Sequence, residues 1–153
     1  MKHTLLAILI ASGLIGCASL KLEPANFAWP VESVLKIDSK GMVEDNRYSF
    51  SFNVKPLFQA EFNDTTASGE IHLIRDMYGY YYITAAKFKN VYTFVANEGN
   101  LSQKNKFLVS ETGLSSPAFN QRDQYIQLLN GKEKSIMLSR DGIQQPENKG
   151  EQK

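Results

Sequence analysis

The sequence predicts an all-β protein, either a single antiparallel β-sandwich or a small β-barrel of about eight or nine strands. From Val31 onward, apolar residues fall on alternate positions in a series of short segments, which is the period of strands with one buried face. Turn-forming residues separate these segments at short intervals. No segment beyond the N-terminal region shows the i, i+3, i+4, i+7 spacing of an amphipathic helix.

The first predicted strands form a hairpin. Residues 33–37 lead into a turn at 38–41, and the return strand runs to Val54. One face of that strand is apolar and the other polar, as expected for a half-buried antiparallel strand. The apolar positions are Tyr48, Phe50, Phe52 and Val54. Apolar alternation resumes at residues 58–62, which predicts another strand, and a polar turn follows at residues 63–69.

Three more turn signals follow along the chain. Strands at residues 70–75 and 80–86 flank a turn at 76–79, and a strand at 91–96 precedes a turn at 97–100. Residues 107–109 form a short strand, and residues 113–124 are predicted to be a loop. Asn130 and Gly131 then join a strand at 125–129 to one at 134–139, because Asn-Gly between apolar runs is a strong hairpin signal. A single short helix at residues 121–129 is the alternative for that stretch.

The N-terminus has the layout of a secretory signal peptide. Lys2 precedes an apolar run at residues 5–15, and these 11 residues suit an h-region of roughly 7–15 but fall short of the about 20 needed to span a membrane. We therefore divide the chain into a signal peptide at 1–16, a tether at 17–30, a β-domain at 31–143 and a tail at 144–153. The tail has no apolar residue and is expected to be disordered.

The end of this segment, Leu14, Ile15, Gly16 and Cys17, resembles the lipobox of bacterial lipoproteins. The resemblance covers the first 17 residues and ends at the only cysteine of the chain. It implies a thioether-linked diacylglycerol on Cys17, cleavage before this residue and acylation of the new amine. Because two or three acyl chains anchor a protein stably, the mature protein is expected to be tethered to a membrane.

The residue after the cysteine bears on where the protein is sorted. In Gram-negative lipoproteins an Asp at that position usually retains the protein in the inner membrane, whereas this chain has Ala18. We therefore expect an outer-membrane protein facing the periplasm if the source is Gram-negative. In a Gram-positive cell the same anchor would place the domain on the outer face of the plasma membrane.

The charge balance excludes a nucleic-acid partner held by a basic surface. The chain carries 17 Lys and Arg against 16 Asp and Glu, and removal of the signal peptide takes away Lys2 and makes the two numbers equal. With a single cysteine and two histidines, neither an internal disulfide nor a Cys/His zinc cluster can form. We expect no cofactor and no metal.

The residues give little support for catalysis, and we expect no enzyme and no catalytic residue. His72 is the only imidazole of the mature chain and has no Gly-x-Ser-x-Gly nucleophile motif to serve. We interpret it as a histidine on the wetter face of a strand beside Glu70. Glycine-rich phosphate loops and calcium-loop spacing are also absent from the sequence. A carboxylate pair drawn from Glu32, Glu61, Glu70 and Glu111 stays open as a hydrolase alternative.

An unusual concentration of tyrosines marks the middle of the chain. Tyr80 and Tyr82 are expected on one face of their strand and Tyr81 on the other. A candidate binding surface would consist of Tyr78, Tyr80, Tyr81, Tyr82 and Tyr92. Tyrosine suits recognition because it offers a large contact area and a polar group. Ordinary cross-strand aromatic packing is the alternative.

Three functional hypotheses follow from the sequence. The first is a non-catalytic lipoprotein of the cell envelope, an accessory module that contacts a protein or peptidoglycan partner through strand edges or the tyrosines. The second is a lipocalin-like carrier of an apolar ligand, since about eight strands can enclose one. The third is a cell-wall hydrolase with a carboxylate pair.

Overall fold

The computed structural model describes residues 31–144, and in this range it contains eleven strands and one short helix. The all-β prediction is therefore confirmed, with more strands than expected. The predicted signal peptide, lipobox, sorting residue Ala18 and tether lie outside the described residues, as does the tail after Gln144. Within residues 31–144, no helix is long and apolar enough to cross a membrane.

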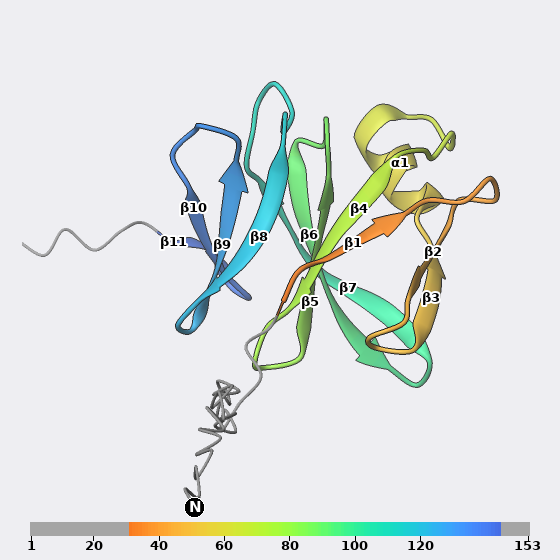
Figure 1. Cartoon of the computed structure of the whole chain (residues 1–153), viewed down its shortest axis with the longest axis horizontal. Helices are drawn as coiled ribbons and strands as arrows, with labels where there is room; N and C mark the ends of the chain where they lie inside the picture. The colour runs from red at the N-terminus through yellow and green to blue at the C-terminus, as the bar shows by residue number, and fades with distance from the viewer. Residues whose placement is uncertain (1–30, 145–153) are drawn as a thin grey trace, which may run out of the picture.

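The largest sheet has five antiparallel strands and runs through the middle of the molecule (Figure 1). Its order is β1-β4-β5-β6-β7, so the hairpin predicted for residues 33–54 is wrong: β1 pairs with β4, and residues 42–53 form a separate hairpin. The strands are β1 (Ser33–Lys36), β4 (Glu70–Arg75), β5 (Tyr80–Ala85), β6 (Asn90–Asn97) and β7 (Asn100–Leu108). β4 and β5 form the hairpin that the sequence predicts, and so do β6 and β7, whose second strand includes residues 107 and 108.

Two smaller sheets lie on either side of it. A four-stranded sheet has the order β11-β10-β9-β8, and a two-stranded sheet pairs β2 with β3. The strands are β2 (Met42–Asp45), β3 (Phe50–Asn53), β8 (Pro117–Arg122), β9 (Tyr125–Asn130), β10 (Ile136–Ser139) and β11 (Gly142–Gln144). Gln144, placed in the tail by the sequence prediction, is the last residue of β11.

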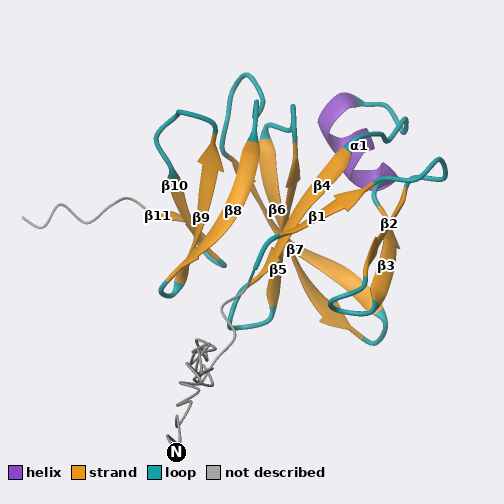
Figure 2. Cartoon of the chain, in the orientation of Figure 1, coloured by secondary structure: helices purple, strands orange, loops and turns teal. Residues whose placement is uncertain are grey.

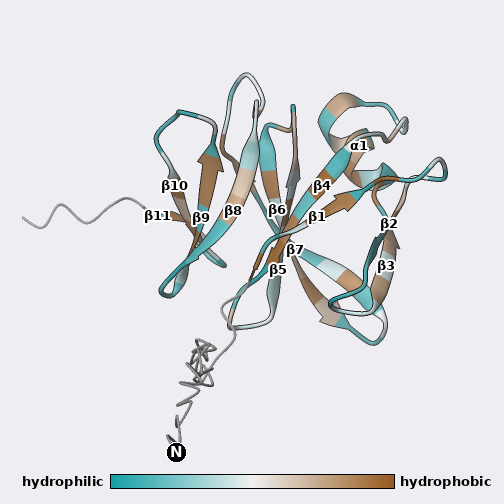
Figure 3. Cartoon of the chain, viewed as in Figure 1, coloured by the Kyte–Doolittle hydropathy of each residue, from teal (hydrophilic) through white to brown (hydrophobic). Residues whose placement is uncertain are grey.

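Each face of the five-stranded sheet has its own hydrophobic core, because side chains alternate between the faces of a strand. Leu73 and Tyr81 point to the side of β2, β3 and the helix, whereas Ile74 and Tyr82 point to the four-stranded sheet. Figure 3 shows hydrophobic residues concentrated along the strands in the middle of the molecule. The protein is thus a sandwich of the five- and four-stranded sheets with a third, smaller layer.

The one described helix corrects a sequence prediction. Residues 58–62 were predicted to be a strand, but they belong to α1 (Lys55–Phe62), which lies beside the β2–β3 hairpin (Figure 2). Pro56 is in the first turn of α1, where its missing N–H costs nothing. Leu57 and Phe58 are the residues that α1 buries, and Asn63 ends the helix in a left-handed conformation.

In the C-terminal third, the loop and the helix alternative predicted before residue 130 are also wrong. Residues 117–122 form β8 rather than loop, and the alternative of a helix at 121–129 fails because β8 and β9 are an antiparallel hairpin. The hairpin predicted around Asn130 and Gly131 is present, because β9 and β10 pair antiparallel, although β10 starts at Ile136 rather than at residue 134. The Asn130 side chain accepts N–H groups from Ser115 and Ser116 and so fixes the loop before β8.

The connection between the two large sheets depends on Gly113. Leu114 and Phe88 are joined by a backbone hydrogen bond of 2.8 Å, and Lys87 donates its N–H to the Leu114 carbonyl at 2.7 Å. Gly113 has a φ of +95°, and a Cβ at this position would lie 2.6 Å from the Lys87 carbonyl oxygen. Only glycine allows this close approach of the two loops.

Candidate functional site

The five tyrosines predicted to form a binding surface are not exposed together. Tyr82 and Tyr92 are almost wholly inaccessible and Tyr81 is 6% exposed, whereas Tyr80 is half-buried and Tyr78 is 57% exposed. Tyr81 and Tyr92 belong to the core on the helix side, and Tyr80 and Tyr82 pack on the other side of the sheet. The predicted two-face alternation is present, but both faces are covered, so only Tyr78 of the five is an exposed residue.

Asp76 explains why Tyr82 can be buried. Its carboxylate accepts the N–H groups of Tyr78 and Tyr80 at 2.9 and 2.8 Å, and the Tyr82 hydroxyl donates to it at 3.2 Å. Burial raises the pKa of Tyr82 well above its ordinary value, and the charge of Asp76 acts in the same direction. This pair fixes the β4–β5 turn and is structural.

Glu61 has the corresponding role for Tyr92. It extends from α1 and accepts hydrogen bonds from the Lys89 N–H, the Asn90 side-chain amide and the Tyr92 hydroxyl at 2.7–2.8 Å. Burial raises the pKa of Tyr92, and the hydrogen bond to Glu61 raises it further. Glu61 therefore attaches α1 to the β5–β6 connection rather than serving in an acid pair.

An open groove of about 360 Å³ lies where the aromatic core reaches the surface. We call it the aromatic groove. It is lined by Phe50, Ser51, Phe52, Tyr81, Ala96, Gly99, Asn100 and Leu101. The β2–β3 hairpin forms one wall and the β6–β7 hairpin the other. The groove thus joins two hairpins that are far apart in the sequence.

The rings of the aromatic groove hold one another in fixed orientations. Tyr81 meets Phe50 edge to face with ring centroids 5.5 Å apart, and it meets Tyr48 in the same way at 5.8 Å. The guanidinium of Arg75 lies 5.5 Å from the centre of the Tyr81 ring. Phe50, Phe52 and Leu101 are half-buried. Rigid, partly exposed rings of this kind suit the binding of apolar side chains.

A register shift in the β6–β7 hairpin helps to form the groove. Thr93 pairs with Asn105 but Phe94 pairs with Gln103, so β7 carries one extra residue there. The Thr93 hydroxyl accepts the Asn105 N–H at 3.1 Å beside the shift. Such bulges increase the local twist of a strand pair. The ends of β6 and β7 therefore turn toward the β2–β3 hairpin (Figure 1).

His72 has a structural partner. Its Nδ1 lies 2.9 Å from Oε1 of Glu32, and the two side chains are 16% and 17% exposed. The same Glu32 oxygen accepts the Phe119 N–H of β8 at 2.8 Å. Glu32 and His72 thus join the five-stranded sheet to the edge of the four-stranded one. Glu70, the neighbour predicted for His72, is exposed.

Two further acidic residues, Asp38 and Asp45, serve turns. Asp38 accepts the N–H groups of Lys40 and Met42, and the bond from Met42 does most to lower its pKa. Asp45, which is buried, accepts the N–H groups of Arg47 and Tyr48. Within residues 31–144, no three His, Cys, Asp or Glu side chains are grouped as metal ligands would be.

Comparison with known proteins adds no relative. No family model, curated protein or solved structure matches this chain. The sequence prediction missed the aromatic groove, although it placed Phe50 and Phe52 on one apolar face. The alternation of Phe50 and Phe52 was the only sequence signal for one wall of the groove. The opposite wall comes from residues 96–101, which no local pattern relates to the first wall.

Proposed function

We propose that this chain is a membrane-anchored lipoprotein of the bacterial cell envelope whose β-domain is a non-catalytic binding module. The lipobox residues 14–17 support the anchor, and the aromatic groove supports binding. In a Gram-negative cell, Ala18 favours the outer membrane, with the domain in the periplasm. The groove is the single structural observation on which the binding role depends.

An extended segment of a protein partner fits the groove best. Among the described residues, β3 pairs only with β2, and β7 pairs only with β6. Each strand therefore has one edge with N–H and C=O groups available for a further strand. Apolar side chains of that strand would contact Phe50, Phe52 and Leu101. Backbone hydrogen bonds would supply affinity, and the rings would supply selectivity.

The two alternatives receive less support from the geometry. A carrier would enclose its ligand, but the interior positions between the layers are filled by side chains with little or no exposure, such as Tyr82, Leu128 and Leu138. A hydrolase would need two converging free carboxylates, but Glu32 and Glu61 are each hydrogen-bonded within the fold. The binding module is therefore the preferred function.

The anchor is tested by replacing Cys17 with Ser and labelling cells with a radioactive or alkyne fatty acid. We expect the wild-type protein to take up label and to shorten by the signal peptide, and C17S to do neither. A mature protein of unchanged size with unchanged labelling in C17S would refute the anchor. Replacing Ala18 with Asp should shift the protein to the inner membrane of a Gram-negative host.

The groove is tested by photo-crosslinking. Ser51, an exposed residue that lines the groove, is replaced by a benzophenone amino acid, with exposed Thr112 as the control position outside it. We expect a discrete crosslinked species from position 51 that is lost when Leu101→Glu is added and is absent from position 112. Equal products from both positions, or products that survive Leu101→Glu, would contradict the groove. A crosslinked product that muramidase shortens would identify peptidoglycan instead of a protein.

A further inference from the structure

Three hairpin turns lie together at the end of the domain where the described chain begins. Val31, the first described residue, lines a groove with Arg122 of the β8–β9 turn. Tyr125 at the other side of that turn lines a second groove with Tyr78 of the β4–β5 turn and Arg140 of the β10–β11 turn. We call this part of the surface the turn end.

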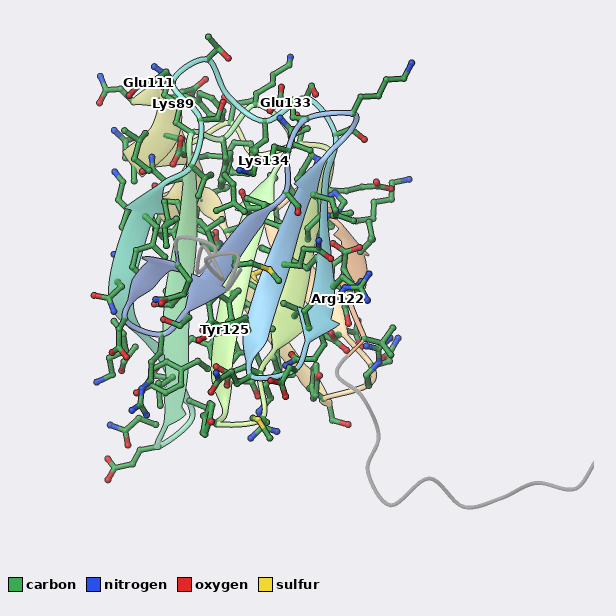
Figure 4. All side chains as sticks on the ribbon, turned by 90° about the vertical axis from the view of Figure 1, so that its left-hand side faces the viewer. Lys89, Glu111, Arg122, Tyr125, Glu133 and Lys134 are labelled. Atoms are coloured by element: carbon green, nitrogen blue, oxygen red, sulfur yellow. The ribbon has the colours of Figure 1, made fainter. Side chains whose placement is uncertain are left out.

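All four arginines of the chain are at or beside the turn end. Arg47 donates from Nη1 to the Val31 carbonyl, and Arg75 is the last residue of β4, directly before its turn. Arg140 lies over the Tyr78 ring, 5.6 Å from its centre. Figure 4 shows the opposite end of the domain, where Lys89, Glu111, Glu133 and Lys134 lie away from Arg122 and Tyr125. Arg122 and Arg140 thus lie at the turn end, whereas Lys89 and Lys134 lie at the opposite end.

The turn end also exposes large apolar side chains. Met77 is 67% exposed, Val31 59% and Tyr78 57%. Met77 and Tyr78 occupy adjacent positions in the β4–β5 turn, and both are exposed. Tyrosine and arginine are suited to the boundary between lipid and water, because each combines an apolar body with a polar group.

We propose that the turn end lies on the lipid bilayer, with Met77 and Tyr78 at the level of the headgroups and Arg122 and Arg140 on lipid phosphates. This inference rests on the proposed lipid anchor at Cys17. The 14 residue steps from Cys17 to Val31 span at most about 50 Å when fully extended. The tether joins the domain at the turn end, so this end can reach the bilayer, and a guanidinium can bind a phosphate with two hydrogen bonds.

The charges at the turn end predict how this contact responds to lipid composition. Asp76, Asp123 and Asp141 belong to the same three turns, and Asp141 lies 3.5 Å from the Arg140 Nε. The surface is therefore close to neutral, and general attraction to anionic lipid is small. We expect the contact to form on phosphatidylcholine vesicles. The quenching that reports it should change less than twofold when anionic phosphatidylglycerol is added.

Fluorescence quenching tests this orientation, with Cys17 carrying the lipid. Two variants of the lipidated protein, Met77→Cys and Lys134→Cys, are labelled at the new thiol with an environment-sensitive dye. Each is then reconstituted into phosphatidylcholine vesicles in which some lipids carry a nitroxide quencher on the headgroup. We expect at least threefold stronger quenching from position 77 than from position 134, which lies at the opposite end. Tyr78→Ser with Arg140→Gln should reduce quenching at 77 by half or more, with circular dichroism confirming the fold.

The outcomes separate this inference from the anchor. Equal quenching at both positions on vesicle-bound protein would overturn the orientation and leave the anchor standing. Quenching at position 77 could instead require phosphatidylglycerol and disappear in 0.5 M salt. That result would overturn the proposed contact with phosphates and the lipid interface, because it would show general charge attraction. Protein that never binds the vesicles would refute the proposed anchor itself.

Discussion

The two faces of the five-stranded sheet are covered to different extents. On one face, the four-stranded sheet packs aliphatic residues such as Ile74, Leu128 and Leu138 into a closed core. On the other face, a two-stranded hairpin and an eight-residue helix cover an aromatic core and leave the groove beside Tyr81 open. A small covering layer therefore leaves an open groove without any loss of burial at the centre.

The largest expected difference between the faces is in how much free energy of unfolding is lost when a large side chain is truncated to alanine. Leu138→Ala on the closed face should lower the free energy of unfolding by about 2–5 kcal/mol, because the enclosing sheets cannot collapse into the space. Phe52→Ala, at the open groove, should cost roughly half as much as the 3–5 kcal/mol typical of buried phenylalanine. Urea unfolding of both variants measures this. Equal losses, with unchanged m values, would show that the two faces are equally closed.

The sequence predicts the elements that local patterns determine and misses those that depend on pairing with distant residues. The β4–β5 and β6–β7 hairpins were predicted because local alternation and turn residues agree. β8 was missed, since Pro117 and its polar residues resemble a loop, and its strand state depends on pairing with β9. In α1 the two-residue spacing of Phe58, Ala60 and Phe62 was mistaken for a strand.

The candidate site was even less accessible to sequence analysis. Its walls, β3 and the β6–β7 hairpin, are about forty residues apart in the chain, and no local period relates them. The same holds for the turn end, where Val31, Tyr78, Arg122 and Arg140 line two grooves only through the topology. The buried state of Tyr82 and Tyr92 likewise depends on Asp76 and Glu61, which supply acceptors for their hydroxyl groups.

A smaller effect is expected from the contact that attaches the helix to the aromatic face. Glu61→Gln should lower the free energy of unfolding by about 1–3 kcal/mol, because an amide cannot accept all three hydrogen bonds that the carboxylate accepts. Glu70→Gln, at an exposed position on β4, is the matched control and should stay within about 0.5 kcal/mol of the wild type. Chemical denaturation measures both. A loss in the control as large as in E61Q would contradict the role of Glu61.

The smallest effect is one of pH, and it concerns the tyrosine buried on each face. Because the pKa values of Tyr82 and Tyr92 are raised in the folded protein, the folded state holds more protons than the unfolded state above about pH 10, where ordinary tyrosine ionises. Their contribution to stability is complete below that pH and is lost as pH rises further. Tyr92→Phe removes one of these two groups, so its stability should fall less steeply between pH 10 and 11. Urea midpoints measured from pH 8 to 11 test this, and parallel curves for wild type and Y92F would show that Tyr92 does not resist ionisation.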